Sequence, residues 1–540
     1  MTLRTHLSEL VFSSALYDLC LGRKAARDIL GTPPDPWPGN GALAESLIAS
    51  PFTFTEAGTP AVGGPWFTTD ASTAARTKLH GFGWLSDLRG LGSDAARVRA
   101  RGLVRDWLIV HGRWRKESWR ADVLGLRLAN WFINFGFLTA GADDTFRQNL
   151  LASLPRQARH LRRAVARAEP GIGMLHALRG LLYAGVCLPA MDDVLGDALD
   201  LLDREIARQI LPDGGHVQRC PTIQVEALRL LVDIRATLAA AHREIPAGLQ
   251  PAIDRMAPMA RSLRHGDGRM ALFNGGNEEE DKDLSTLLAQ AGARGKAISS
   301  APHSGFNRLA AGRTLVIVDA GVPPPPDLDR RAHAGTLGFE MSVGRDRLVV
   351  NCGDYRGDDP DWRRALRATA AHSTLAVNDV NSSDVVPDGG LGRRPRIVDC
   401  QRREADGNLW LETSHDGYSE ILGLVHHRHF YLSHDGTDFR GMDRLAGTST
   451  PTADGVVFTI RFHLHPQVQS SLVRDGTQAL LKMPTGTGWR FMAAGGTLAL
   501  EDSVYLGAGD GVRRCRQIVV AGQVGPGETV VKWAFHREAK

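Results

Sequence analysis

The chain has 540 residues, of which 43% are hydrophobic and 23% are charged. It is therefore too long for one ordinary domain, and its composition excludes an intrinsically disordered protein. The 64 basic and 60 acidic residues give a formal net charge of only +4, which excludes a polybasic protein of the histone type, so no nucleic-acid partner is expected.

The beginning of the chain does not have the pattern of a secretory signal. An apolar stretch runs from Leu10 to Leu16, but Ser13 and Ser14 interrupt it and no small-residue cleavage site follows. No segment of the chain approaches the roughly 20 apolar residues that span a bilayer, so no integral membrane segment is expected. These features predict a cytoplasmic location.

The first 300 residues have the periodicity of α-helices. Leu124, Leu128, Trp131 and Phe135 recur every three or four positions and so share one helix face. Similar stretches cover residues 175–188, 193–211 and 225–242. Turn signals such as Pro170-Gly171 separate them, and the pattern predicts a succession of helices paired in hairpins.

After Ser299 the pattern changes to that of β-strands. Short runs rich in Val, Ile and aromatic residues cover 313–321, 337–353, 372–379, 458–466, 516–522 and 528–537, and Gly, Asp and Asn bound them. Phe458, Ile460, Phe462 and Leu464 alternate with polar residues and should lie on one face of a strand. Many strands without intervening helices predict an antiparallel sandwich. The sequence thus predicts a helical domain over 1–300 and a β-domain over 301–540.

Several motifs in both halves resemble those of one known family. In the helical half they are HGFGWLSDLRGLG, SWRADVLGLRLANW, GIGMLHALRGLLYAG and QILPDGGHVQRCP; in the second half they are HAGTLGFEMSVGRDRLVVNCGDY, WRRALRATAAHSTLAVND and DGYSEILGLVHHRHFYLSHDGTDFRGMDRL. In this order they resemble the heparinase II/III family of polysaccharide lyases, from about residue 78 to the end. The resemblance implies an α+β multidomain fold, with an incomplete (α/α) toroid followed by an antiparallel β-sandwich.

The resemblance also implies a reaction, β-elimination at a uronic acid of an acidic polysaccharide or oligosaccharide. A base must remove the C5 proton, an acid must protonate the leaving oxygen, and the sugar carboxylate must be neutralised. The family uses an Asn-His pair and a Tyr from its toroid for this work. At the matching positions this chain has Ile172 and Gly173, and then Ile223 and Gln224, which cannot move a proton or bind a carboxylate in the same way.

The β-domain keeps more of the family's polar positions. In the zinc-containing branch of the family two His and one Asp bind the metal, and the matching residues here are His333, Asn351 and His372. The resemblance therefore allows zinc, although an amide replaces the carboxylate ligand; the alternative is a hydrogen-bonded polar cluster. Arg331 occupies the position of a catalytic His of that branch.

Other residues are candidates for the missing chemistry. His216 follows the PDGG turn and is a candidate base together with His333, since imidazole titrates near neutral pH. Arg219 is a candidate for neutralising the sugar carboxylate, and His176 is a second imidazole candidate in the helical half. The structural alternatives are a histidine bonded to backbone at a helix start for His216 and a core histidine for His176.

Substrate contacts are expected from the SWRADVLGLRLANW segment and from Arg331. Trp119 offers a flat apolar face for a sugar ring, Arg127 a bidentate partner for a carboxylate, and Asn130 an amide. Trp131 is expected to belong to the core.

Three functions remain open at this stage. The first is a lyase of a uronate-containing saccharide. The second is a glycoside hydrolase on the same scaffold, with Glu278 and Glu280 about 5 to 9 Å apart as acid and base. The third is a non-catalytic saccharide-binding protein that has lost the family's Asn-His and Tyr. Family members that cleave polysaccharides usually work in the periplasm or outside the cell, which is the alternative to a cytoplasmic location.

Overall fold

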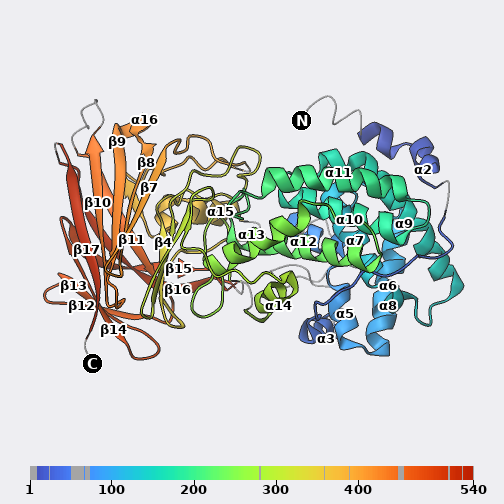
Figure 1. Ribbon diagram of the computed structural model, residues 1–540, viewed down its shortest axis with the longest axis horizontal. Coiled ribbons are helices and arrows are strands. Elements are labelled where there is room, and N and C mark those ends of the chain that lie inside the picture. The colour runs from blue at the N-terminus through green and yellow to red at the C-terminus, as the bar shows by residue number, and fades with distance from the viewer. Residues whose placement is uncertain are drawn as a thin grey trace. The chain divides into compact units, whose positions relative to one another are not determined.

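A computed structural model describes residues 9–22, 25–49, 66, 73–278, 281–357, 359–387, 389–447, 455–508, 511–525 and 527–538. Helices dominate the first half of the chain and antiparallel strands the second (Figure 1). The predicted fold class is confirmed: an incomplete (α/α) toroid is followed by an antiparallel β-sandwich.

The helical half begins with short helices and continues with longer ones. The helices are α2 (Ala15–Leu21), α3 (Gly41–Ala49), α4 (Thr73–Gly81), α5 (Leu85–Leu91), α6 (Asp94–His111), α7 (Ala121–Ile133), α8 (Phe135–Thr139), α9 (Asp144–Ala164), α10 (Ile172–Cys187), α11 (Asp192–Gln209), α12 (Pro221–Ala240), α13 (Leu249–Ser262) and α14 (Asp281–Ala291). Side-chain caps begin two of the long helices: Ser93 accepts a hydrogen bond from the backbone N–H of Ala96, and Asp143 accepts one from that of Phe146.

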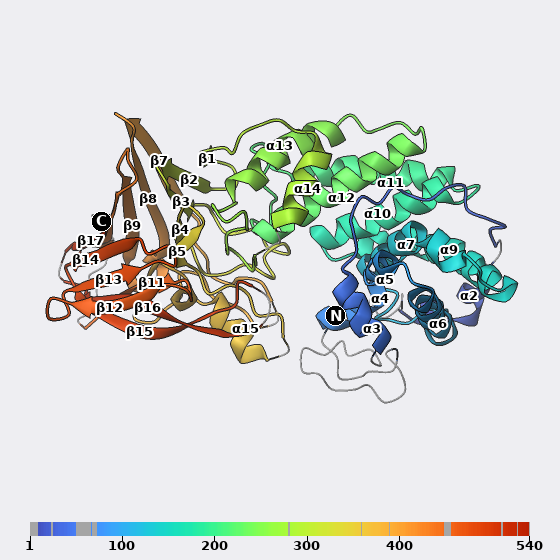
Figure 2. The same ribbon diagram turned by 90° about the horizontal axis from the view of Figure 1, so that it is seen from below.

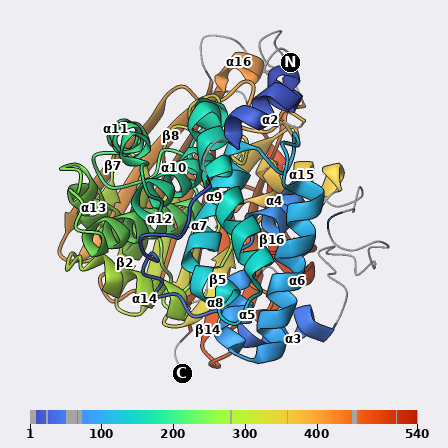
Figure 3. The ribbon, with the colours of Figure 1, turned by 90° about the vertical axis from the view of Figure 1, so that its right-hand side faces the viewer.

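Helices α7 and α10 lie side by side (Figures 2 and 3) and approach closely where two glycines meet. A Cβ atom on Gly125 would lie 2.3 Å from the carbonyl oxygen of His176, and one on Gly180 would lie 2.5 Å from the Cα atom of Gly125. Both glycines are therefore required for this helix contact rather than for backbone flexibility. The segments that carry the family motifs SWRADVLGLRLANW and GIGMLHALRGLLYAG pack directly on each other here.

The second half forms two antiparallel sheets. One has the order β1 (Ser300–Ala301), β2 (Phe306–Ala311), β3 (Thr314–Asp319), β4 (Phe339–Val343), β5 (Asp346–Val350), β11 (Val457–Leu464), β16 (Arg513–Gln523), β15 (Thr497–Tyr505), and β6 (Leu375–Val377) also pairs with β11. The other has the order β12 (Gln469–Val473), β13 (Gln478–Lys482), β14 (Gly488–Ala494), β17 (Thr529–Arg537), β10 (Asp438–Gly447), β9 (Leu424–Leu432), β8 (Asn408–Tyr418), β7 (Val398–Ala405). Two short helices, α15 (Pro360–Arg367) and α16 (Ser419–Leu422), lie in the connections.

Aromatic side chains fill the core of this half. The rings of Phe339 and Trp533 stack with centroids 5.7 Å apart, and Phe462 meets Trp533 edge-on at 4.9 Å. The predicted inward face of β11 is confirmed, since Phe458, Ile460, Phe462 and Leu464 are at most 1% exposed. Trp131, expected in the core, is also buried.

By compactness the chain divides into two units. Unit 1 consists of residues 1–208 and 229–251, and unit 2 consists of 209–228 and 252–540. The secondary structure changes from helix to strand between α14 and β1, near the predicted boundary at residue 300, but part of the helical half belongs to unit 2. Among the described residues, no helix combines the length and the apolar composition that crossing a membrane requires.

Candidate functional site

Arg127, predicted to bind a sugar carboxylate, lies in the interior of unit 1. It is fully buried, and its guanidinium donates to Gln157 Oε1 (2.7 Å), to the carbonyl of His80 (3.1 Å) and to that of Ser118 (2.7 Å). Its Cζ atom lies 4.2 Å from the centroid of the Trp107 ring, and burial holds the pKa of the guanidinium well below its usual value. These contacts join α7 to four other segments of the helical unit.

The other candidates in unit 1 differ in how deeply they are buried. Trp119 is 1% exposed and its indole N–H donates to the carbonyl of His111 (2.8 Å). Asn130 is half-buried and its amide donates to the carbonyl of Gly81 (2.7 Å). His176 is half-buried on α10. The structure thus places Trp119 inside the unit and leaves Asn130 and His176 partly accessible.

His216, the candidate base after the PDGG turn, is enclosed in unit 2. Its Nδ1 atom accepts the backbone N–H of Gln218 (3.2 Å), so the proton resides on Nε2, which lies 3.0 Å from Gln209 Oε1. Its backbone N–H donates to Gln224 (2.7 Å), the residue at a position where the family has catalytic groups. Burial lowers the pKa of His216 to about 3, so the imidazole is neutral at physiological pH.

Arg219, three residues later, is an internal cross-link of unit 2. Its guanidinium forms a buried ion pair with Asp319 at the end of β3 and donates to the carbonyls of Ser304 (2.7 Å) and Val322 (2.9 Å). Asn274 joins the same group by donating to the carbonyl of Arg219 (3.1 Å). His216 and Arg219 therefore adjoin in one loop, and both are occupied by contacts within the protein.

His333 and His372 are brought together as the resemblance implies. The Nδ1 atom of His333 lies 3.0 Å from the Nε2 atom of His372, and both side chains are buried. Gly335 leaves room for the pair, because a Cβ atom there would lie 2.6 Å from the His372 ring. Burial holds the pKa of His333 well below its usual value and lowers that of His372 to about 4.

The third predicted zinc ligand, Asn351, does not complete a metal site. Its Oδ1 atom accepts the backbone N–H of Ser373 (3.0 Å), and its amide nitrogen donates to the carbonyl of Leu272 (3.2 Å). A zinc site needs nitrogen, sulfur or carboxylate donors that point at one position, whereas the two imidazole atoms that face each other here are joined by a hydrogen bond. Among the described residues, no three His, Cys, Asp or Glu side chains are arranged to hold a metal. The residues present do not fit zinc.

Arg331 lies beside this histidine pair at the surface. Its side chain is 42% exposed and pairs with Asp354 at 3.0 Å. The other carboxylate oxygen of Asp354 is 4.0 Å from the Nε2 atom of His333. Arg331, His333 and Asp354 thus form one polar cluster in unit 2, with the arginine on its exposed side.

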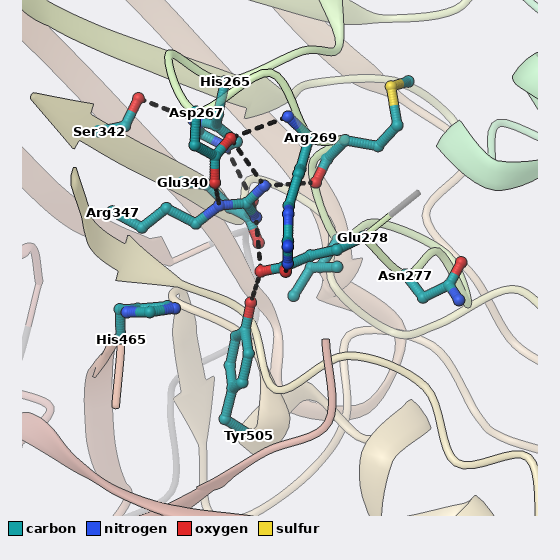
Figure 4. A network of polar contacts seen from close by, with 12 residues as sticks. His265, Asp267, Arg269, Asn277, Glu278, Glu340, Ser342, Arg347, His465 and Tyr505 are labelled. Atoms are coloured by element: carbon teal, nitrogen blue, oxygen red, sulfur yellow. Dashed lines mark hydrogen bonds and ion pairs between the residues drawn. The ribbon is translucent and has the colours of Figure 1, made fainter. Parts of the chain in front are cut away.

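A larger buried network lies elsewhere in unit 2 (Figure 4). Its charged and polar members are His265, Asp267, Arg269, Glu278, Glu340, Ser342, Arg347 and Tyr505. Arg347 lies near its centre: the Nε atom donates to Asp267 (2.8 Å), Nη2 donates to the carbonyl of Met270 (3.0 Å), and Nη1 lies 3.5 Å from Glu278. Residues from the 265–278 segment, β4, β5 and the end of β15 meet there.

Glu278, one of the two predicted hydrolase carboxylates, is part of this network. It accepts hydrogen bonds from the Tyr505 hydroxyl and from Arg269 (2.6 Å). Burial alone would raise the pKa of Glu278, but Arg347, Tyr505 and Arg269 hold it below its usual value. A general acid needs a raised pKa, so Glu278 is unsuited to that role. The second carboxylate, Glu280, lies outside the described residues.

The same network extends through Glu340 to Asn351, the third predicted zinc ligand. His265 lies 2.9 Å from both Glu340 Oε2 and Ser342 Oγ, and the Oε1 atom of Glu340 accepts the backbone N–H of Asn351 (2.9 Å). Glu340 and Arg347 were not predicted from the sequence. Their signal was a charged residue inside a largely apolar strand, FEMSV or DRLVV, which indicates a buried ion pair because an unpaired charge would be too costly there.

Known protein families match both halves of the chain. The family described as Heparinase II/III N-terminus matches residues 110–293, and the family described as Heparinase II/III-like, C-terminal matches residues 293–534. The chain belongs to the heparinase II/III family, and the resemblance read from its motifs is confirmed. It is also 30% identical to FtsZ-localized protein C of Caulobacter vibrioides, over 96% of this chain and 92% of that protein.

Solved structures agree with this assignment at the level of fold. A heparinase III structure has a TM-score of 0.74 at 13% identity and is matched over 97% of this chain and 89% of its own. A mutant of the heparan sulfate lyase HepC from Pedobacter heparinus has a TM-score of 0.65 at 16% identity, over 92% of this chain and 83% of its own. The chain thus has a polysaccharide lyase-like architecture.

Proposed function

We propose that this protein is a non-catalytic, polysaccharide lyase-like protein that localises with FtsZ. The observation that carries this proposal is the 30% identity to FtsZ-localized protein C, which extends over 96% of the chain. The solved lyases share the fold at only 13–16% identity. Similarity over 96% of this chain and 92% of that protein favours a shared cellular role.

The geometry of the predicted catalytic groups supports the non-catalytic part of the proposal. His216 is a neutral, buried imidazole whose two nitrogen atoms are both hydrogen-bonded within the protein. Arg219 and Arg127, the predicted partners of a sugar carboxylate, are occupied by an internal carboxylate and by backbone carbonyls. If either guanidinium left these partners to bind a ligand, buried polar groups would be left without hydrogen bonds, which is unfavourable by several kcal/mol.

Two measurements on the full-length protein test this proposal. A fluorescent fusion, expressed from the native locus, is expected to co-localise with FtsZ and to disperse when FtsZ is depleted. The purified protein is expected to generate no unsaturated-uronate absorbance from heparan sulfate or other uronate polymers, under conditions in which a heparinase III control does so. A diffuse fusion would contradict the localisation, and growing absorbance would contradict the loss of catalysis.

A second candidate, β-elimination of an acidic polysaccharide, rests on the cluster around His333. Among the described residues, the buried Nε2 atom of His333 has no hydrogen-bond partner, so its lone pair is not used within the protein. Arg331 lies beside it with a partly exposed guanidinium that suits a uronate carboxylate. This arrangement supplies a base and a neutralising cation, although the low pKa of His333 makes it a weak base.

The test for this candidate is the same absorbance assay on variants. His333→Ala and Arg331→Ala should each abolish any activity, whereas His434→Ala, at an exposed histidine of the β-domain, should retain it. Activity that survives in both of the first two variants would remove this site from consideration.

The cytoplasmic location is also a proposal, and fractionation of cells that express a C-terminally tagged chain tests it.

A further inference from the structure

The outer face of the second sheet carries a groove with a volume of about 650 Å³. It lies over β8, β9, β10, β17 and β14, which are neighbours in the middle of the sheet. Its lining residues include Trp410, Glu412, His429, Tyr431, Arg440 and Lys532. A volume of this size lies in the range of small-molecule sites.

The strand register arranges the floor of the groove as a continuous row. Trp410 lies opposite Tyr431, Tyr431 opposite Arg440, Arg440 opposite Ala534, and Ala534 opposite Met492. Five strands at their usual spacing give this row a length of about 19 Å. It therefore offers an elongated surface that runs across the strands.

Two aromatic rings at one end of the row are held in place. The centroids of Trp410 and Tyr431 are 5.3 Å apart, and both side chains are half-buried. Arg403 lies over Trp410 at 4.6 Å, and the Tyr431 hydroxyl donates to Asn408 (3.1 Å). An accessible aromatic platform that is already ordered loses little entropy when a flat ligand stacks on it.

A second row provides polar groups beside this platform. Glu412 lies opposite His429, His429 opposite Met442, and Met442 opposite Lys532. Glu412 and Lys532 are thus three strand spacings apart, or about 14 Å, which is too far for an ion pair. Both are exposed, and in the described part of the chain neither forms a salt bridge or a hydrogen bond through its side chain. They are available as an acceptor and a donor for a bound molecule.

The charges of the groove balance. The two cations Arg440 and Lys532 are matched by the two anions Glu412 and Asp438, and Arg440 is paired with Asp438. Counted over its Asp, Glu, Lys and Arg side chains, the lining has no excess of cations that would favour a polyanion. An occupant with apolar ring faces and uncharged hydrogen-bonding edges matches the groove better.

The position of the groove also argues against an extended peptide. A peptide that adds a strand needs an unpaired sheet edge, whereas β9, β10 and β17 are paired on both sides. The groove must therefore recognise its ligand through side chains.

We propose that this groove binds an uncharged oligosaccharide, with a sugar ring on Trp410 and hydroxyl groups directed to Glu412, His429 and Lys532. The site lies entirely within unit 2 and does not depend on the proposed localisation with FtsZ. It also differs in ligand charge from a site for uronate polymers.

Isothermal titration calorimetry on the full-length protein tests this site. The probes are two neutral tetrasaccharides, cellotetraose and tetra-N-acetylchitotetraose, and one sulfated heparin tetrasaccharide. We expect at least one neutral probe to bind more tightly than the sulfated one. We expect Trp410→Ala to weaken that binding about tenfold, which corresponds to about 1.4 kcal/mol, and Trp410→Phe to weaken it less.

Leu480→Ala is the matched control, since Leu480 is 37% exposed on the same sheet and is not part of the groove lining. It should bind as the wild type does. If Trp410→Ala does not fold, Glu412→Gln and Lys532→Ala replace it, since both residues are exposed and both should weaken binding. Absence of binding by both neutral probes, preference for the sulfated probe, or wild-type affinity in the groove variants would overturn the proposal.

Discussion

The hydrogen bond between His333 and His372 fixes the protonation state of both imidazoles. The Nδ1 atom of His372 lies 2.8 Å from the carbonyl oxygen of Ala368, which can only accept, so this nitrogen carries the proton. Its Nε2 atom must then accept from the Nδ1–H of His333 (3.0 Å). The outer nitrogen of His333 is left with a lone pair, and two neutral histidines form a directional chain within the β-domain.

The hydrogen bond between the two histidines leads to a prediction about the zinc content of the protein. Because each imidazole uses a facing nitrogen in the shared hydrogen bond and the Asn351 amide is occupied, the purified protein should contain far less than one zinc per chain by atomic absorption. Treatment with EDTA should leave Tm unchanged, and equimolar zinc should not raise it. One tightly bound zinc per chain, whose removal lowers Tm, would contradict the arrangement described for these residues.

Because of the Glu278 carboxylate, the free energy of unfolding should depend on pH in the acid range. Its folded-state pKa lies below the ordinary value of 4.5, so its contribution is fully present above pH 4.5 and is lost as the pH falls through the folded-state pKa. Glu278→Gln should lower the free energy of unfolding by about 3–5 kcal/mol at pH 7, because Arg347 and Arg269 lose a buried partner. The difference between the two proteins should narrow as the pH falls below 4.5.

Urea denaturation at several pH values measures this effect. Glu404→Gln is the control, since Glu404 has a side chain 63% exposed and should change stability little at any pH. A Glu278→Gln variant as stable as the wild type at pH 7 would show that the network of Figure 4 does not stabilise the fold.

The sequence contained most of the information on the fold because periodicity is local. The helical spacing of Leu124 and Leu128 and the alternation of Phe458 and Ile460 each need only one segment, and both segments have the predicted structure. The resemblance to the family likewise predicted that His333 and His372 lie close together. The periodicity of a single segment does not depend on knowing which distant segments meet, whereas the contact of the two histidines came from the family resemblance.

The polar contacts could not be predicted in the same way. Tyr505 and Glu278 are 227 positions apart, and Arg219 and Asp319 are 100 positions apart. The sequence near Glu278 is a run of acidic residues, which by itself suggests a solvated loop or a catalytic acid rather than a partner of buried arginines. Whether an arginine binds a ligand or the protein's own carbonyls is decided by the tertiary structure, as Arg127 illustrates.

His216 should produce a second pH dependence, at higher pH. Its pKa is lowered by burial from 6.5 to about 3, so the folded state favours the neutral imidazole. The stability contribution of this group is complete above pH 6.5 and falls by up to about 1.4 kcal/mol per pH unit below that value, since the unfolded chain binds one more proton. His216→Gln should therefore be less stable at pH 8, with a difference from wild type that shrinks as the pH falls toward 4.

Denaturation curves from pH 8 to pH 4 test this prediction, with His242→Gln as the control. His242 is exposed, so its replacement should leave the curve of the wild type unchanged. A His216→Gln variant that runs parallel to the wild type over this range would mean that His216 is accessible to protons in the folded state, as a catalytic base would be.

The close approach of α7 and α10 can be tested with two glycine-to-alanine variants. Gly102, in the middle of α6, has no atom within 4 Å of the position of an added Cβ, so Gly102→Ala should stabilise the protein by about 0.5–1 kcal/mol through helix propensity. Gly125→Ala has the same intrinsic advantage, but its methyl group would lie 2.3 Å from the backbone oxygen of His176. Because backbone atoms on a packed helix cannot move aside without separating the helices, Gly125→Ala should lower stability by about 1–3 kcal/mol. Thermal and urea denaturation should therefore give shifts of opposite sign for the two variants, and a stabilised Gly125→Ala protein would show that α7 and α10 are not in contact at this glycine.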